Sequence, residues 1–270
     1  MANKSIDILG VRIDILKISQ INEIILDRAN RVSGDPLVVF KPYVEFLALS
    51  ARNDDIRALL GKSDYNVADS SALQWAASYL YGSPKKISAI KSLLFKIHSI
   101  AWRSQVIPQR MGGVDQTIPL LKLASDNNFK IGILGGPKDV DRTQQQLLKR
   151  FKGIDLKVWS GYYSASSEAQ LVKQISDSKL DILFCAMGFP KQEYFIVNNR
   201  AKLGAKVLIG EGGSFDYDSL GGPLKRAPAL LRRLSLEWLW RLLLQPRRAV
   251  RQLSIPIFIA KVIKQKSIQK

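Results

Sequence analysis

Asp69 occupies the position in the chain that most directly suggests chemistry. It follows an apolar run over residues 65–68, typical of a buried strand, and it precedes a helix-like stretch over residues 71–81. A carboxylate at the carboxyl end of a strand can take a proton from an attacking hydroxyl group. The competing interpretation is an N-cap, because Asp is favoured at the residue that precedes a helix. Position alone leaves both interpretations open.

Two further segments combine cations with glycine or proline. Arg110 stands beside two glycines and could grip a phosphate bidentately, although a surface turn with a solvated Arg explains the pattern equally well. Lys191 and Gln192 follow Phe189-Pro190 at the expected start of a helix, and a helix N-terminus attracts anions. The alternative for this second segment is a plain strand-to-helix junction, which rarely needs Lys, Gln and Glu together.

Glycine-containing junctions follow three of the expected strands, at Gly135-Gly136, at Gly188 and over residues 210–216. The last of these reads Gly-Glu-Gly-Gly-Ser-Phe-Asp, a flexible loop whose backbone could approach a ligand closely. It runs into Asp216-Tyr217-Asp218, an Asp-x-Asp pattern that can bind a divalent cation. Such a short pattern arises often by chance, and a hard cation needs more oxygen ligands than these two side chains supply. We therefore predict no metal site.

An alternation of short apolar runs and helix-like stretches must position these candidates. It predicts an α/β fold with a Rossmann-like, doubly wound and mostly parallel sheet. Ligands bind such sheets at the carboxyl ends of the strands, where the candidate residues fall. Neither the G-x-G-x-x-G fingerprint nor a Walker A sequence occurs, which disfavours a dehydrogenase and a P-loop enzyme. The expected strands are residues 37–40, 65–68, 130–134, 156–159, 182–187 and 206–209, and the expected helices are residues 44–60, 71–81, 139–151, 167–178 and 192–203.

Positive charge is concentrated at the end of the chain. The whole sequence carries a formal net charge of +18, and residues 221–270 contain twelve Lys or Arg and one acid, Glu237, for a net charge of +11. Leucines and tryptophans recur there at helical spacing with arginines between them, until Pro246 interrupts the pattern. We expect an α/β catalytic domain over residues 1–220 and a helical, basic appendage over residues 221–270, which ends in a short mixed segment from 254 to 270.

The basic appendage has several candidate partners. A basic amphipathic helix with Trp and Leu on its other face is typical of elements that lie on a membrane surface. The alternative is a helix packed on the core with a solvated basic face. A nucleic-acid-binding protein is a further alternative, but no nucleic-acid motif is recognised and the Trp and Leu content fits lipid better. We therefore predict a membrane surface as partner and no nucleic acid.

The remaining composition limits the possible chemistry. Cys185 lies inside an apolar run, so we predict an inert buried thiol, and with His98 it cannot form a Cys/His metal site. A single cysteine fits a reducing cytoplasm. No uncharged apolar stretch reaches the ~18 residues that a membrane span needs, so we expect the protein to lie on a membrane rather than cross it.

Taken in order, these segments resemble the WecG/TagA/CpsF family of glycosyltransferases over nearly the whole chain. No single motif is decisive, but the order of the motifs and the specificity of the Pro-Lys-Gln-Glu and Lys-Arg-Ala-Pro blocks make chance agreement improbable. The matching motifs are Ile8-Leu9-Gly10-Val11, Ala68-Asp69-Ser70, Arg110-x-x-Gly113-x-Asp115, Leu134-Gly135-Gly136, Gly161-Tyr162-Tyr163, Gly188-Phe189-Pro190-Lys191-Gln192-Glu193, Gly212-Gly213-Ser214-Phe215-Asp216, Lys225-Arg226-Ala227-Pro228, Leu236-Glu237-Trp238-Leu239-Trp240-Arg241 and Gln245-Pro246-Arg247-Arg248.

The resemblance implies an inverting, metal-independent enzyme without a cofactor. It would transfer N-acetylmannosamine, its uronic acid or a related sugar from a UDP-sugar to an undecaprenyl-diphosphate-linked saccharide at the cytoplasmic face of the cell membrane. Family members form dimers or trimers, so a homo-oligomer is also open. The implied residues are Asp69 as base, Arg110 as phosphate ligand, Gln192 as active-site amide, Tyr162 and Asp216 at the uracil, and Arg241, Arg248 and Arg251 from an appendage that closes over the site.

The sequence departs from the family pattern beside the expected site. The family's Thr-Pro-Asn-Pro-Glu stretch appears here as Lys41-Pro42-Tyr43-Val44-Glu45, so Lys41 and Tyr43 replace the Thr and Asn that would face the sugar. A bulkier and charged lining indicates a different or acidic donor sugar or acceptor. Ser70 replaces the glycine after the catalytic Asp, which is a smaller change.

Overall fold

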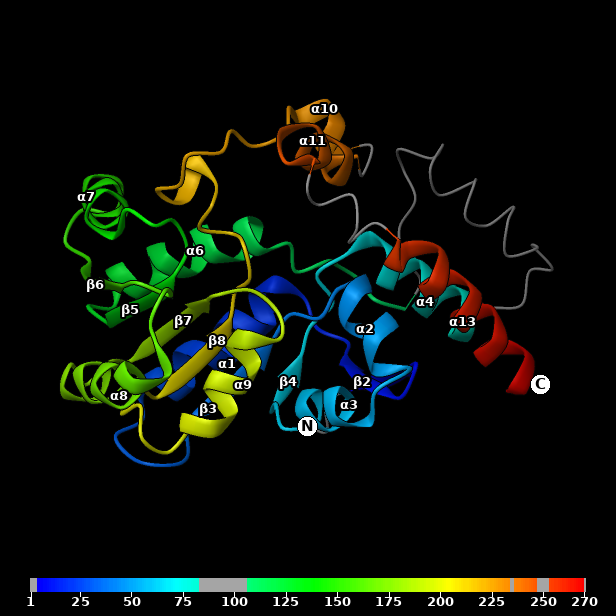
Figure 1. Ribbon diagram of the computed structural model, residues 1–270, viewed down its shortest axis with the longest axis horizontal. Coiled ribbons are helices and arrows are strands. Elements are labelled where there is room, and N and C mark those ends of the chain that lie inside the picture. Colours follow the sequence, from blue (N-terminus) through cyan, green and yellow to red (C-terminus); the bar gives the residue numbers. More distant parts are fainter. Residues whose placement is uncertain (1–3, 83–105, 234–235, 247–252, 270) are drawn as a thin grey trace.

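A parallel sheet forms the centre of the protein. The computed structural model describes residues 4–82, 106–233, 236–246 and 253–269. Within them six strands lie in the order β4-β3-β8-β7-β5-β6, and every neighbouring pair is parallel (Figure 1). This confirms the predicted α/β class and parallel sheet. The strands are β3 (Leu37–Phe40), β4 (Tyr65–Asn66), β5 (Lys130–Gly135), β6 (Asp155–Trp159), β7 (Ile182–Ala186) and β8 (Val207–Gly210).

Helices cover both faces of this sheet, as a doubly wound fold requires. Successive strand residues point to opposite faces, and they enter two separate apolar cores. Val38 and Leu208 belong to one core together with α2, α4, α8 and α9, whereas Val39 and Ile209 belong to the other core together with α1, α6 and α7. The bounds are α1 (Ile18–Asn30), α2 (Val44–Ser50), α4 (Ser71–Tyr81), α6 (Gly113–Asp126), α7 (Val140–Arg150), α8 (Glu168–Asp177) and α9 (Lys191–Asn199).

The predicted helix over residues 44–60 is divided in the structure. It consists of α2 and a second helix, α3 (Asp54–Leu60). The Asn53 side chain accepts a hydrogen bond from the Ile56 amide at 3.1 Å and so caps α3. The first backbone N–H groups of a helix have no acceptor within the helix. Because the Asn side chain accepts a hydrogen bond from one of them, it favours the start of a new helix at this point over one continuous helix.

Four elements, two strands and two helices, were not predicted from the sequence. A two-stranded antiparallel sheet of β1 (Ser5–Ile8) and β2 (Val11–Asp14) opens the fold. The helix α1 starts directly after Lys17, and Lys is not a usual N-cap residue. The helix α6 starts directly after Gly112 and contains Pro119, a residue that normally interrupts a helix.

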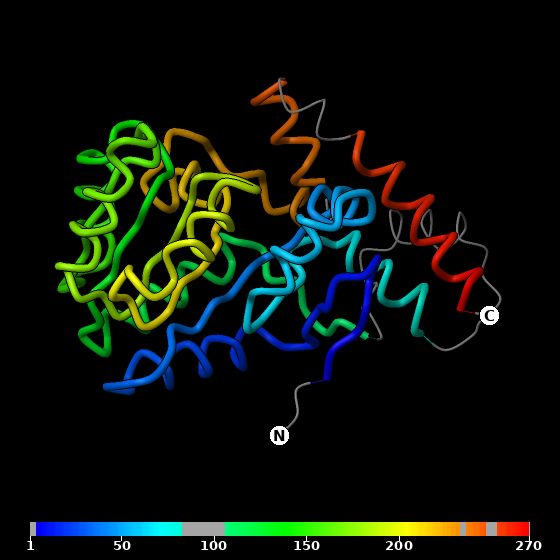
Figure 2. The backbone as a smooth tube through the Cα atoms, turned by 60° about the horizontal axis from the view of Figure 1, so that its bottom comes forward, coloured from blue at the N-terminus to red at the C-terminus, as the bar shows by residue number. Residues whose placement is uncertain are grey.

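The end of the chain is more ordered than predicted. The expectation of a short mixed segment over 254–270 is wrong, since α13 (Ser254–Ile268) is a helix of 15 residues that lies alongside α2 and α4 (Figures 1 and 2). Phe258 and Val262 are fully buried in the same core as α2 and α4. Pro256 is tolerated because it lies in the first turn. The last helix of the predicted appendage thus shares a core with the α/β domain.

In the described part of residues 221–270, two shorter helices precede α13. They are α10 (Ala229–Arg233) and α11 (Glu237–Leu244), and α11 leaves Leu243 69% exposed and Leu244 42% exposed. Among the described residues, no helix is both long enough and apolar enough to cross a membrane.

Phe258→Ala tests whether α13 is part of the core. Removing a buried Phe side chain typically costs about 3–5 kcal/mol, because apolar contacts are lost and a cavity remains. We expect a loss of this size in the free energy of unfolding, measured by urea denaturation. The matched control is Ile268→Ala on the same helix, where the side chain is 74% exposed, and it should change stability by less than about 0.5 kcal/mol. Equal effects at the two positions would contradict the packing described here.

Candidate active site

A cavity of about 590 Å³ lies at the carboxyl ends of the strands. Loops that follow β3, β4, β5, β6, β7 and β8 line it, together with residues of α11 and the start of α13. The structure brings nine of the predicted site residues to its walls: Asp69, Arg110, Gly135, Gly136, Tyr162, Lys191, Gln192, Asp216 and Arg241. The other two, Arg248 and Arg251, lie outside the described residues.

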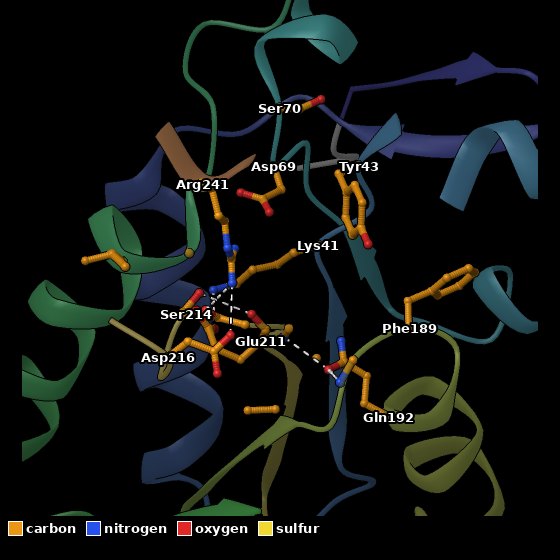
Figure 3. Close-up of a pocket in the computed structure, with 18 of the residues that line it drawn as sticks. Lys41, Tyr43, Asp69, Ser70, Phe189, Gln192, Glu211, Ser214, Asp216 and Arg241 are labelled. Carbon is orange, nitrogen blue, oxygen red and sulfur yellow. Dashed lines mark hydrogen bonds and ion pairs between the residues drawn. The ribbon is translucent and has the colours of Figure 1, made fainter. Parts of the chain in front are cut away.

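Asp69 is not the cap of the helix that follows it. The N-cap of α4 is Ser70, whose hydroxyl accepts a hydrogen bond from the Leu73 amide at 3.3 Å. The N-cap interpretation of Asp69 is therefore wrong, and its carboxylate is available to the cavity (Figure 3). The Asp69 amide donates to the Pro42 carbonyl at 3.1 Å, which ties the residue to the loop after β3.

Burial changes the acidity of Asp69. Desolvation is the largest effect and raises the pKa of the Asp69 carboxyl to about 7. Glu211 adds to this rise, whereas Lys41, Arg110 and Arg241 oppose it. A carboxylate with a pKa near neutrality is suited to accept a proton from a hydroxyl group.

A buried ion pair lies next to Asp69. The Lys41 ammonium pairs with the Glu211 carboxylate, and both side chains are almost completely buried. The Thr117 hydroxyl donates to the other oxygen of Glu211. Sequence reasoning noted Lys41 only as a departure from a family pattern and missed Glu211. The available signal was a lysine directly after a buried strand, because a buried ammonium needs a carboxylate partner.

Gln192 connects two loops of the cavity. Its side-chain oxygen accepts hydrogen bonds from the Gly188 amide at 3.2 Å and the Gly212 amide at 3.0 Å. Its side-chain nitrogen donates to the Glu193 carboxylate at 2.8 Å. Gln192 therefore joins the loops that follow β7 and β8, and its predicted catalytic role stays a prediction.

Glu193 is a buried carboxyl that sequence reasoning passed over. Its side chain is fully buried, and its Oε2 atom has no hydrogen-bond partner among the described residues. Desolvation raises the pKa of Glu193 to about 7, against a smaller opposing effect from its bond to Gln192. The same environment raises the pKa of the Cys185 thiol, mainly through burial and secondarily through Glu193. The predicted burial of Cys185 is confirmed.

The arginine of α11 is held by the loop after β8. Arg241 donates to the Asp216 carboxylate and to the Gly213 carbonyl, both at 3.0 Å, and it lies 5.0 Å from the centre of the Tyr217 ring (Figure 3). A Cβ atom at Gly213 would collide with the guanidinium, so this approach depends on glycine. Asp216, which is predicted to contact the uracil, and Arg241, which is predicted to come from the appendage that closes over the site, are therefore in contact with each other.

A second cluster of charged side chains joins α6 and α11 through Arg226, which precedes α10. Arg226 contacts the carboxylates of Asp115 at 2.7 Å and Glu237 at 3.2 Å. Arg110 lies farther from the same two carboxylates, at 3.9 Å from Asp115 and 3.7 Å from Glu237. Because Arg110 makes these looser pairs and its side chain is 27% exposed, its guanidinium can turn to an anion in the cavity.

One wall of the cavity carries Gly135, Tyr162 and Lys191, which are further predicted ligands. The Lys191 ammonium donates to the Gly161 carbonyl at 2.9 Å and lies 4.3 Å from the centre of the Tyr163 ring. Tyr162 is 67% exposed at the rim. Gly135 has φ +103°, and a Cβ atom there would lie 2.6 Å from the Ala186 carbonyl oxygen. This wall therefore brings bare backbone, an aromatic ring and one cation to the cavity.

Comparisons with known proteins show which family the chain is similar to. The family model for the glycosyl transferase WecG/TagA/CpsF family matches residues 6–96 and 97–270. A protein of Staphylococcus aureus strain MRSA252, named N-acetylglucosaminyldiphosphoundecaprenol N-acetyl-beta-D-mannosaminyltransferase, is 30% identical over 262 residues, covering 97% of this chain and 93% of its own. The protein of the same name from strain NCTC 8325 / PS 47 is 29% identical over the same share of both chains.

Glu193 predicts a pH dependence of stability. A folded-state pKa of about 7 lies above the ordinary value of 4.5, so the native state binds this proton more tightly than the unfolded state. The contribution of Glu193 to the free energy of unfolding is thus fully present below about pH 4.5 and is lost as the pH rises through 7. This loss makes the protein less stable as the pH rises. We expect Glu193→Gln to remove this part of the pH dependence of the free energy of unfolding, which is at most about 1.4 kcal/mol per pH unit.

The measurement is the free energy of unfolding between pH 5 and 8 for both proteins. The matched control is Glu23→Gln, an exposed position on α1, which should keep the wild-type slope. A slope that Glu193→Gln leaves unchanged would show that the buried carboxyl is ionised throughout this range.

Proposed function

We propose a specific reaction for this chain, which belongs to the WecG/TagA/CpsF family of glycosyltransferases. The enzyme transfers an N-acetylmannosamine-like or uronic acid-like sugar from a UDP-sugar to an undecaprenyl-diphosphate-linked saccharide, with inversion at the anomeric carbon. The names of its relatives support a lipid-linked acceptor and an N-acetylmannosamine donor. The product enters cell-surface polysaccharide or teichoic acid synthesis.

The proposal depends mainly on the position and acidity of the Asp69 carboxyl. Its carboxylate reaches the cavity, and its pKa of about 7 allows it to be ionised before the reaction and protonated after it. The acceptor oxygen attacks the anomeric carbon, the bond from that carbon to the UDP oxygen breaks, and Asp69 takes the hydroxyl proton. UDP leaves with the bonding electron pair and a negative charge.

Arginines neutralise that charge in the proposed reaction. Arg110 is loosely paired and part-exposed, and Arg241 reaches the same cavity from α11. Preorganised cations at the position where charge develops lower the barrier of the chemical step. Asp216 is engaged by Arg241, which supports this role over a metal site at Asp216-Tyr217-Asp218.

The donor nucleotide fits the wall of the cavity that carries Gly135, Tyr162 and Lys191. Tyr162 at the rim offers a ring to the uracil, and Asp216 offers a carboxylate oxygen to the uracil N–H. The backbone at Gly135 and Gly136 has positive φ and no side chain, so a phosphate can approach it closely. Lys191 adds a cation on the same wall.

The helix α11 links this site to a membrane surface in the proposal. Its Glu237 and Arg241 side chains line the cavity, whereas Leu243 and Leu244 are exposed, as is Leu230 of α10. Exposed apolar side chains within a basic segment support binding at a lipid headgroup boundary, and residues 221–270 carry a net charge of +11. We therefore place the enzyme in the cytoplasm, peripheral at the inner face of the cell membrane, where its acceptor is anchored. Association with a second copy through the same side chains is the alternative.

Asp69→Asn tests the base directly. The change preserves the size of the side chain and removes the proton acceptor, so kcat should fall by about 10²–10⁴-fold. UDP binding, measured by isothermal titration calorimetry, should stay within a fewfold of wild type because the nucleotide ligands are untouched. Wild-type turnover by this variant would exclude Asp69 as the base.

The same assay runs in excess EDTA as a control for the arginine mechanism. Wild-type activity should persist there, since the proposed reaction neutralises UDP with guanidinium groups. Activity that EDTA abolishes and Mg²⁺ restores would contradict that part of the proposal. It would also favour a metal at Asp216-Tyr217-Asp218.

Membrane docking is tested by the double change Leu243→Ser and Leu244→Ser. We expect weaker co-sedimentation with phosphatidylglycerol-containing vesicles, because the exposed apolar surface of α11 is reduced. Leu148→Ser is the matched control, since this leucine on α7 is 39% exposed and belongs to another part of the surface. Undiminished vesicle binding by the double variant would exclude α11 as the docking element.

A further inference from the structure

We propose that the buried ion pair of Lys41 and Glu211 positions the charge around the catalytic base: Lys41 keeps the Asp69 carboxylate ionised, and Glu211 holds Lys41 in place. This inference rests on the proposed function, in which Asp69 is the base. It assigns a role to Lys41, at which the chain departs from its family's pattern, and to Glu211, which sequence reasoning missed.

The sheet topology brings these three residues together. The strands β4, β3 and β8 are neighbours in that order. Lys41 directly follows β3 and Glu211 directly follows β8, and Val39 is in register with Ile209, which places both side chains at the same level of the sheet edge. The Asp69 amide donates to the carbonyl of Pro42, the residue after Lys41. The base is thus anchored to the segment that carries the ammonium (Figure 3).

Glu211 is a holder of Lys41 rather than a second base. One of its oxygens accepts from the Lys41 ammonium and the other from the Thr117 hydroxyl of α6. Both carboxylate oxygens are therefore engaged within the protein, and the side chain is fully buried. A buried ammonium without such a partner would be strongly destabilised.

The position of Lys41 makes its charge act on Asp69 and not on a ligand. Its side chain is only 3% exposed and its ammonium is bound to Glu211, so it cannot turn freely to a carboxylate of an acidic sugar. The charged groups that face Asp69 are Lys41, Glu211, Arg110 and Arg241. Among them Lys41 favours the ionised carboxylate most strongly, and its effect exceeds the opposing effect of Glu211.

The inference predicts an order of Asp69 titration midpoints. Lys41→Met should move the midpoint to higher pH by about one unit or more, which at a fixed pH below the midpoint lowers the ionised fraction about tenfold. Glu211→Gln should move it to lower pH, because an opposing negative charge is lost. The double variant should lie above wild type and below Lys41→Met. Lys41→Arg keeps the cation and should stay near wild type.

The titration is followed by carboxyl ¹³C NMR of the full chain labelled at aspartate, with Asp69→Asn used to assign the resonance. Thr117→Val is the matched control, since it removes a hydrogen bond to Glu211 without changing any charge. If Lys41→Met does not fold, the double variant replaces it, because that variant leaves neither charge buried without a partner. The inference would be overturned if the Asp69 titration midpoint were the same in wild type and in Lys41→Met, or in the double variant where that one replaces it.

Activity measurements separate this inference from the proposed function. Lys41→Met should lower kcat at pH 7 and recover most of it near pH 9, where Asp69 is ionised again, whereas a purely structural defect would not recover with pH. An unchanged kcat in Asp69→Asn would overturn the base and, with it, the role of Lys41. A lost kcat in Asp69→Asn together with unshifted midpoints would overturn only the inference about Lys41.

Discussion

Desolvation of charged groups at the carboxyl edge of the sheet determines how this site is built. Parallel strands end together there, so the side chains that follow them are crowded between two cores and lose water. The Asp69 and Glu193 carboxyls respond through pKa values raised to about 7 by burial. The Lys41 ammonium responds by pairing with Glu211, which leaves no net charge in the pair. A nearly neutral edge can hold an ionisable base without a large cost in stability.

The same constraint explains why the pocket cations are held by carboxylates from distant segments. Arg241 of α11 contacts Asp216 of the loop after β8, and Arg226 contacts Asp115 of α6. These pairs are only part-buried, and each adds little stability on its own. Their effect is geometric. Arg241 belongs to α11 and Arg226 also contacts Glu237 of α11, so these contacts fix α11 over the cavity while α13 packs into the core beside α2 and α4. The part of the chain that meets the cavity is thus connected to the part that supplies the base.

Much of the fold could be predicted from the sequence, because buried parallel strands are short apolar runs and their bounds were correct to within two residues. Local signals were less reliable where tertiary packing prevailed. Pro119 and the glycines before it disfavour α6, yet the helix forms because one of its faces enters a core. The final segment looked mixed because its apolar positions do not form a clear stripe, although Phe258 is fully buried.

The residues of the site could be predicted from the sequence, but the ion pairs between them could not. The predicted ligands from Asp69 to Arg241 all reach one cavity, since strand ends are recognisable in a sequence. The Lys41–Glu211 pair spans 170 positions, and no local pattern connects its members. The pH dependence of wild-type kcat/KM tests the whole account most directly, because a base in the free enzyme sets its acid limb. We predict a limb with a midpoint of about 7, as expected for Asp69. A limb near the ordinary aspartate value of 3.8, or no limb between pH 5 and 8, would contradict it.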